Sequence, residues 1–233
     1  IFFTSRPVGD AMATTIWGTS SSWTLTALPL FVWMGEILFR TKLSENLFEG
    51  LSPWMQKLPG GLIHVNVVGC ALFAAISGSS AATVATVGKM SIPELRKRNY
   101  PEKILLGSLA GSGTLGLLIP PSIILIIYGV IVQESIAKLF IAGILPGIMI
   151  AILFMFYVIV WSLINKKLMP KSFENFSLFE KIRRSKKLLP VIILILAVIG
   201  SIYTGIATAT EAAVAAGVRL RRRRRLQAEC DRP

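Results

Sequence analysis

The chain of 233 residues has little of the side-chain chemistry on which most enzymes and metal proteins depend. It contains one histidine and two cysteines, and Cys70 in an apolar run and Cys230 in a polar stretch show neither zinc-binding spacing nor a disulfide framework. The sequence also lacks a nucleotide-binding loop, a metal-ligand cluster and paired membrane carboxylates. We therefore predict a protein that is not an enzyme and that carries no cofactor.

Charge is scarce as well. Only 16% of the residues are charged, 53% are hydrophobic and the mean hydropathy is +0.66, which excludes a water-soluble globule. The formal net charge is +13, but a nucleic-acid-binding protein needs a soluble basic face or a reader domain, and so apolar a sequence leaves room for neither. We expect no nucleic-acid partner and interpret the charge together with a lipid bilayer.

The lone His64 and the serine Ser77 invite comparison with an intramembrane serine protease. On one helix, at about 100° per residue, their spacing places them about 140° apart, so they do not share a face. We expect His64 and Asn66 to lie at the interfacial start of a membrane span.

Apolar stretches long enough to matter for a membrane dominate the sequence, since a hydrocarbon core of ~30 Å takes roughly 20 helical residues. A sixth stretch would begin near Glu211. We predict an all-α integral membrane protein, a multi-span helical bundle. The first five stretches are Trp23 to Phe39, Gly61 to Ala82, Ile104 to Val132, Leu139 to Leu163 and Leu188 to Ala207.

Basic residues concentrate in two segments, Thr83 to Lys103 and Ile164 to Lys187, which we predict to be loops on the cytoplasmic side. Two spans separate them, so a consistent topology places them on the same side. The connector Gln133 to Lys138 has one acid and one base and suits the outer face. We expect both basic segments to set orientation alone.

The third stretch should break near its centre, because as one straight helix it would be about 43 Å long. Pro120 and Pro121 have no backbone N–H, so the carbonyl oxygens of Gly116 and Leu117 lose their helical donors. Carbonyls freed in mid-membrane can bind a cation, and a helix beginning after Ser122 would direct its positive end toward an anion. The alternative is a proline kink without a ligand, but Ser112 and Thr114 add hydroxyls on one side of the break.

The end of the second stretch is irregular in a different way, because it reads Ser77-Gly-Ser-Ser80. Small residues in a span permit close helix packing, which is one interpretation. Three hydroxyls around a glycine also offer the hard oxygen ligands that Na⁺ prefers, and Gly78 lets a helix open and present its carbonyls. The sequence therefore predicts that Ser77, Gly78, Ser79 and Ser80 form part of a binding site.

The first stretch is marginal as a span, because it has Pro29 inside and Glu36 near its end. We expect it to form a re-entrant hairpin with residues 14–22, a shape that is tolerated where it lines a cavity. Glu36 is either an intramembrane carboxylate or an interfacial group close to Arg40, and we favour the interfacial interpretation because Glu36 lies near the end of the stretch.

The two ends of the chain give separate signals. Residues 1–22 show no signal-peptide pattern and begin with Ile1, so we expect the chain to begin within a longer protein. Residues 218–233 form an Arg-rich polar tail, which is either a cytoplasmic stop signal in contact with anionic lipid, a nucleic-acid arm, or an artefact such as a frameshift or an artificial chain end. We favour the last interpretation, because the composition changes within one or two residues.

Five motifs follow one another along the chain, namely Leu58 to Val68, Ala75 to Ala82, Ile92 to Glu94, Gly113 to Ser122 and Gly205 to Ala213. Together they resemble the large membrane subunit of tripartite ATP-independent periplasmic (TRAP) transporters. The likeness runs from about Thr14 to Gly217, and it identifies residues 1–217 as a transmembrane fragment of this family. It implies a sodium-driven importer of organic acids such as C4-dicarboxylates in the bacterial inner membrane. It also implies an elevator-type architecture with re-entrant hairpins and broken helices in inverted repeats, and two partners, a small membrane subunit and a periplasmic substrate-binding protein.

Carried onto this sequence, the resemblance places sodium and substrate binding on Ser77 to Ser80 and on the break, namely Gly113, Thr114, Gly116, Leu117, Pro120, Pro121 and Ser122, with Thr208, Thr210 and Glu211 as further candidates. Two departures matter. The family usually has proline where Ala209 stands, and it continues beyond Gly217, so we expect about one inverted repeat and no transport by this polypeptide alone. The alternative from another class is a membrane scaffold or assembly subunit that binds partner helices and no ion.

Overall fold

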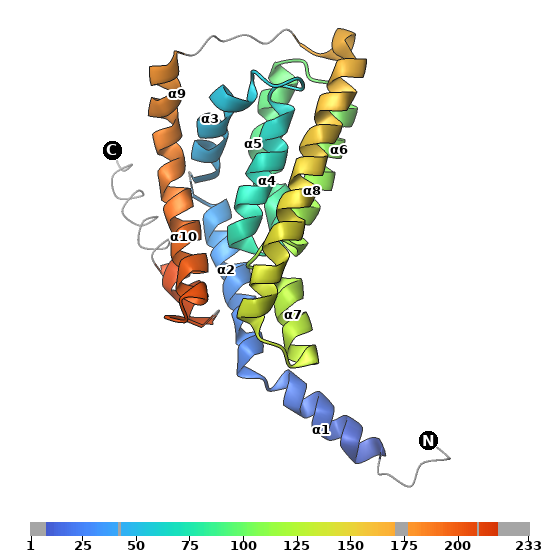
Figure 1. The fold of residues 1–233 in the computed structure, drawn as a ribbon, viewed down its shortest axis with the longest axis vertical. Coiled ribbons are helices and arrows are strands. Elements are labelled where there is room, and N and C mark those ends of the chain that lie inside the picture. The colour runs from blue at the N-terminus through green and yellow to red at the C-terminus, as the bar shows by residue number, and fades with distance from the viewer. Residues whose placement is uncertain (1–7, 42, 171–176, 209, 219–233) are drawn as a thin grey trace.

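The computed structural model describes residues 8–41, 43–170, 177–208 and 210–218, and these contain helices and turns but no strands. Most helices run alongside one another along the long axis of the molecule, while α1 points away from them (Figure 1). The elements are α1 (Val8–Ser20), η1 (Trp23–Thr26), α2 (Ala27–Phe39), α3 (Leu43–Met55), α4 (Ile63–Ser77), α5 (Ser80–Lys97), α6 (Glu102–Gly113), η2 (Thr114–Leu117), α7 (Ile123–Val132), α8 (Ile136–Ile164), η3 (Lys166–Leu168), α9 (Leu178–Ser185), η4 (Lys186–Leu188) and α10 (Leu189–Tyr203).

Helix α4 lies at the centre of the bundle, where it packs against α2, α3, α5, α6 and α8. Most of its residues are buried on every side, as expected for a helix that is apolar all round. It ends because Gly78 adopts a left-handed conformation with φ 61°, and the Gly78 N–H closes the last turn on the Ala74 carbonyl. The predicted opening of the second apolar stretch at this glycine is confirmed.

The chain reverses at once into α5. Ser79 is extended at φ −127° and accepts the Ala82 N–H on its side chain, so it caps the new helix. The prediction of a loop over residues 83–103 is therefore wrong, because most of that segment is helix α5. Together α4 and α5 form a helical hairpin whose tip is residues 77–80.

The predicted break of the third apolar stretch is confirmed. Helix α6 ends at Gly113, the short η2 follows, and a new helix, α7, begins only at Ile123, beyond the two prolines. In Figure 1 α6 and α7 follow each other along one side of the bundle, with the break between them at the level of the hairpin tip.

Two helices are long and apolar enough to cross a membrane, namely Ile136–Ile164 and the continuous helix Leu178–Tyr203, which joins α9 to α10. They correspond to the fourth and fifth predicted stretches. The second predicted loop, residues 164–187, is partly helical, because it contains η3, α9 and η4, while Lys171 within it lies outside the described residues. The turn between α5 and α6 and the start of α9 lie at one end of the bundle, and the α7 to α8 turn lies at the other (Figure 1).

The first apolar stretch does not form the predicted hairpin. Residues 14–20 belong to α1, which has no buried residue and points away from α2 (Figure 1). Helix α2 instead buries Ala27, Phe31 and Met34 against the bundle. Glu36 is exposed and accepts a hydrogen bond from Arg40 Nε at 2.6 Å, which agrees with the interfacial interpretation of that carboxylate.

Candidate functional site

The two irregular segments that the sequence singled out meet in the structure. The Ile123 N–H, at the start of α7, donates to the carbonyl oxygen of Gly78 at the hairpin tip, with 3.3 Å between the two atoms. A Cβ atom on Gly116 would lie 2.9 Å from Ser80 N, and one on Gly78 would lie 2.6 Å from the Pro121 carbonyl oxygen. The backbones of the two segments therefore touch directly, and glycine is required on both sides of the contact.

Hydroxyl groups within the tip bind one another. Ser77 is fully buried, and its Oγ lies 2.9 Å from Thr83 Oγ1. Thr83 also donates through Oγ1 to the Ser79 carbonyl oxygen at 2.8 Å. Thr83 was missed by the sequence reasoning, which placed it in a loop. Its position four residues after Ser79, on the same turn of α5, is the signal that points to it.

One hydroxyl at the tip is left over. Ser80 Oγ is buried and has no hydrogen-bond partner among the described residues. Leaving a buried hydroxyl unpaired costs about 1–3 kcal/mol, so native structures rarely keep one without a reason. Because Ser80 also contacts Gly116 through its backbone, this oxygen lies close to the junction of the two segments.

One of the two carbonyl groups that were predicted to be free in the break has a donor. Ser122 is fully buried, and its Oγ donates to the Leu117 carbonyl oxygen at 2.6 Å, so that carbonyl is not free. The Gly116 carbonyl oxygen has no donor among the described residues, as the missing N–H of Pro120 leads one to expect. Ser122 therefore supplies a hydrogen-bond donor to one of the two carbonyl groups that the prolines leave without a helical donor.

The remaining residues of the break face other directions. Thr114 is exposed and its Oγ1 donates to the Gly111 carbonyl oxygen at 2.7 Å, whereas Ser112 is buried toward α4. The side chain of Leu117 is also exposed. Gly113 is buried against α5, where a Cβ atom would lie 1.9 Å from a methyl group of Val84. The structure therefore gathers the backbone and Ser80 at the junction and leaves the Thr114 hydroxyl outside it.

A polar seam joins α4 to α6 beside this junction. Asn66 Nδ2 donates to Ser108 Oγ at 3.1 Å, and Ser112 Oγ donates to the Asn66 carbonyl oxygen at 3.4 Å. His64 and Asn66 lie in the first turn of α4, at the start of the predicted span, and both side chains are fully buried within the bundle. His64 and Ser77 lie at opposite ends of the unbroken α4, so they do not form a protease pair.

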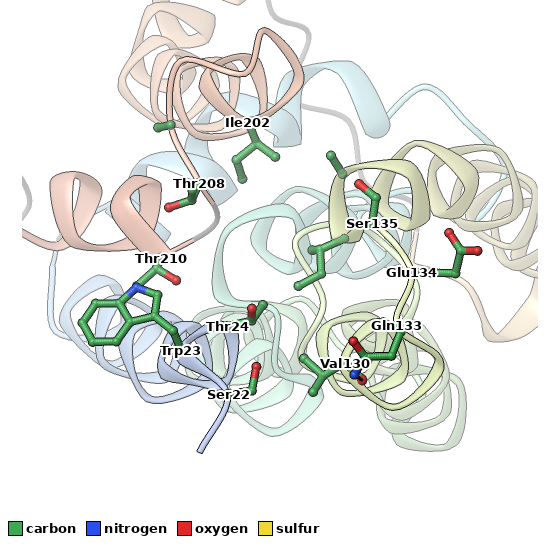
Figure 2. Close-up of a pocket in the computed structure, with 14 residues that line it drawn as sticks. Ser22, Trp23, Thr24, Val130, Gln133, Glu134, Ser135, Ile202, Thr208 and Thr210 are labelled. Carbon is green, nitrogen blue, oxygen red and sulfur yellow. Dashed lines mark hydrogen bonds between the residues drawn. The ribbon is translucent and has the colours of Figure 1, made fainter. Parts of the chain in front are cut away.

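The further candidates lie elsewhere. Thr208 and Thr210 line a separate cavity of about 410 Å³, shown in Figure 2, together with Trp23 and residues of the turn between α7 and α8. Thr208 and Glu211 form a capping box: Glu211 Oε2 accepts the Thr208 N–H at 2.8 Å, and the Glu211 N–H donates to Thr208 Oγ1 at 3.3 Å. The pair begins the helix over residues 210–218, while Ala209 and residues 219–233 of the Arg-rich tail lie outside the described residues.

The part of the chain that the structure describes has long apolar helices and a helical hairpin that meets a broken helix, which are features of a membrane transport protein. The family model described as "Tripartite ATP-independent periplasmic transporter, DctM component" matches residues 1–220, and the chain belongs to this family. The resemblance found in the sequence motifs is thereby confirmed.

Curated relatives agree with the family. The chain is 36% identical over 208 residues to the C4-dicarboxylate TRAP transporter large permease protein DctM of Pseudomonas aeruginosa, a match that covers 89% of this chain and 48% of the relative. It is 36% identical to the ectoine/5-hydroxyectoine large permease protein UehC of Ruegeria pomeroyi (82% of this chain, 44% of the relative) and 34% identical to the sialic acid permease protein SiaT of Haemophilus influenzae (84% and 31%). The chain spans about half the length of such relatives or less, and each of them is named as a transporter permease.

Proposed function

We propose that this chain is part of the permease subunit of a sodium-coupled secondary transporter that imports organic acids across the bacterial inner membrane, which it crosses several times. A periplasmic binding protein delivers the substrate, and a small membrane subunit completes the complex. The observation that carries the proposal is the junction of the hairpin tip with the broken helix, where Ser80 Oγ and the Gly116 carbonyl oxygen have no partner among the described residues.

Oxygen chemistry at the junction supports Na⁺ as the coupling ion. Hydroxyl and carbonyl oxygens are the ligands that hard cations prefer, and Ser80 and Gly116 bring one of each from two different segments. A bound cation would repay the cost of two polar groups that are unpaired at membrane depth.

The start of α7 supports an anionic substrate. The first N–H groups of a helix carry a partial positive charge, and α7 begins at Ile123 immediately beside the hairpin tip. Relatives are named for C4-dicarboxylate, ectoine or sialic acid, so the proposal names organic acids as a class and no single compound.

Sodium-dependent uptake by the permease with its partner subunits in proteoliposomes tests the proposal. Replacing Ser80 by Ala removes the unpaired oxygen, and we expect the half-saturating Na⁺ concentration to rise about tenfold, the effect of losing roughly 1.4 kcal/mol of binding. Ser91→Ala is the matched control, because Ser91 Oγ on the same helix is also buried without a partner but lies three turns from the tip. We expect that control to keep the Na⁺ dependence of the parent.

A membrane scaffold that binds partner helices and no ion predicts a different result. In that case Ser80→Ala and Ser91→Ala would act alike, and neither would change the Na⁺ dependence of uptake. Thr114→Ala distinguishes the site predicted from the sequence, which includes Thr114, from the junction seen in the structure. The Thr114 hydroxyl already donates to the Gly111 carbonyl oxygen and lies outside the junction. A large effect at Thr114 with none at Ser80 would move the site away from the hairpin tip.

A further inference from the structure

A charged cleft of about 750 Å³ lies between α3, α5 and α9, far from the hairpin tip. Helix α3 packs against both α5 and α9 and lines the cleft with Glu45, Phe48 and Glu49. Its Trp54 donates from Nε1 to Ser185 Oγ at 2.7 Å, and the buried Lys181 places its ammonium 5.7 Å from the centre of the Trp54 ring. These contacts hold α9 against α3, so two of the helices that line the cleft are fixed relative to each other.

Helix α9 turns its charges into this cleft and its apolar residues outward. Glu180, Arg183 and Arg184 line the cleft, whereas Phe179 and Ile182 are 78% and 58% exposed. This is the arrangement of a helix that borders lipid at a membrane surface. The cleft is therefore a polar space bordered by a helix with an exposed apolar face, at the end of the bundle that carries the basic turn between α5 and α6 (Figure 1).

The charges that line the cleft are equal in number, and most of them are already paired. Arg98 Nε donates to Glu94 Oε1 at 2.9 Å within α5, and Arg184 donates to Glu180 at 3.0 Å within α9. Lys187 forms an ion pair with Glu49 across the cleft, between η4 and α3. Three acids and three bases are thereby neutralised.

One acid and one base remain. Glu45 on α3 and Arg183 on α9 line the same cleft, are both exposed, and have no ion-pair partner among the described residues. The cleft thus offers one negative and one positive group, on two facing elements, to whatever occupies it. A ligand with one anionic and one cationic group is the complement of this pair, and the balanced charge of the lining gives a purely anionic ligand no advantage.

We propose that the cleft binds the headgroup of a phospholipid that carries one phosphate and one primary ammonium, as in phosphatidylethanolamine. Arg183 takes the phosphate and Glu45 takes the ammonium. A primary ammonium has N–H donors for a carboxylate, and the Lys187 to Glu49 pair shows that this cleft already holds such a contact. A choline headgroup has no N–H to donate.

Lipid retention in nanodiscs tests the proposal independently of transport. The permease is incorporated into phosphatidylcholine discs that contain phosphatidylethanolamine or phosphatidylglycerol, and the bound lipid is counted by native mass spectrometry. We expect phosphatidylethanolamine to be retained about fivefold over either other lipid, the scale set by a pair of surface charge contacts. Glu45→Gln and Arg183→Gln should each abolish this preference, while Glu102→Gln and Lys103→Gln, at the same end of the molecule but outside the cleft, should keep it.

Other outcomes overturn the proposal. Equal retention of all three lipids means that the two groups are merely solvated, and a preference for phosphatidylglycerol that depends on Arg183 alone means a simple anion contact. Soluble phosphoethanolamine that displaces the lipid at equal concentration would assign the cleft to a free solute. Thermal unfolding of each variant in pure phosphatidylcholine discs verifies that the substitutions leave the fold intact.

Discussion

Replacing Gly116 by Ala probes the junction most directly. The added Cβ would meet Ser80 N at 2.9 Å and the carbonyl carbon of Ser79 at 3.0 Å, and both are backbone atoms that no rotamer change can move. Ordinary contacts of this kind begin at 3.4 Å, so the tip and the break must separate. Overpacking of this kind costs about 1–3 kcal/mol.

Gly107→Ala is the internal standard for that measurement. Gly107 lies on α6, is exposed, and a Cβ there meets nothing within 4 Å, so the change should stabilise the helix by up to about 1 kcal/mol. The two variants should therefore differ by roughly 1–4 kcal/mol, which corresponds to about 2–16 °C in Tm. Tryptophan fluorescence of the purified permease on heating gives the Tm.

The same pair of variants links the junction to function. In proteoliposomes we expect Gly116→Ala to raise the half-saturating Na⁺ concentration, because the unpaired oxygens on the two segments move apart, and Gly107→Ala to leave it unchanged. If both variants share one Tm and one Na⁺ dependence, the two backbones do not touch in the functional protein, and the reasoning from the junction fails.

Three further substitutions test its parts. Gly78→Ala forces a side chain into a left-handed turn at φ 61° and against the Pro121 carbonyl oxygen, so its Tm should fall further than that of Gly116→Ala. Ser122→Ala leaves the Leu117 carbonyl without a donor and should cost about 1–3 kcal/mol in thermal unfolding. Thr208→Ala removes a helix cap far from the junction, so it should cost about 1 kcal/mol and leave the Na⁺ dependence of uptake as it was.

The sequence predicted those features that follow from single residues. Glycine and proline restrict the backbone wherever they stand, so the breaks at Gly78 and at Pro120 could be placed without a structure. Length and hydropathy placed α8 and α10 for a similar reason, because a long apolar run has few alternatives to a helix in lipid.

Features that depend on partners distant in the chain were not predictable in this way. The burial of Asn66 could not be inferred from its neighbours in the sequence, because its partner Ser108 lies 42 residues further on. Helix α5 looked like a loop because it is poor in apolar residues and its end is basic. Basic residues indicate the side of the membrane and not the secondary structure. Helix α5 is stabilised by the cap at Ser79 and by packing against α4 and α6.

The hairpin tip and the break depend on each other for their hydrogen bonds. The turn at Gly78 exposes a carbonyl oxygen that α4 cannot satisfy, and the start of α7 exposes the Ile123 N–H, which has no acceptor within its own helix. Each irregular segment supplies the group that the other lacks, so neither could remain at membrane depth alone without a cost of several kcal/mol. What stays unpaired after this exchange, Ser80 Oγ and the Gly116 carbonyl, comes from both segments. An ion bound there would therefore report on the contact between the segments, and any motion that parts them would release it.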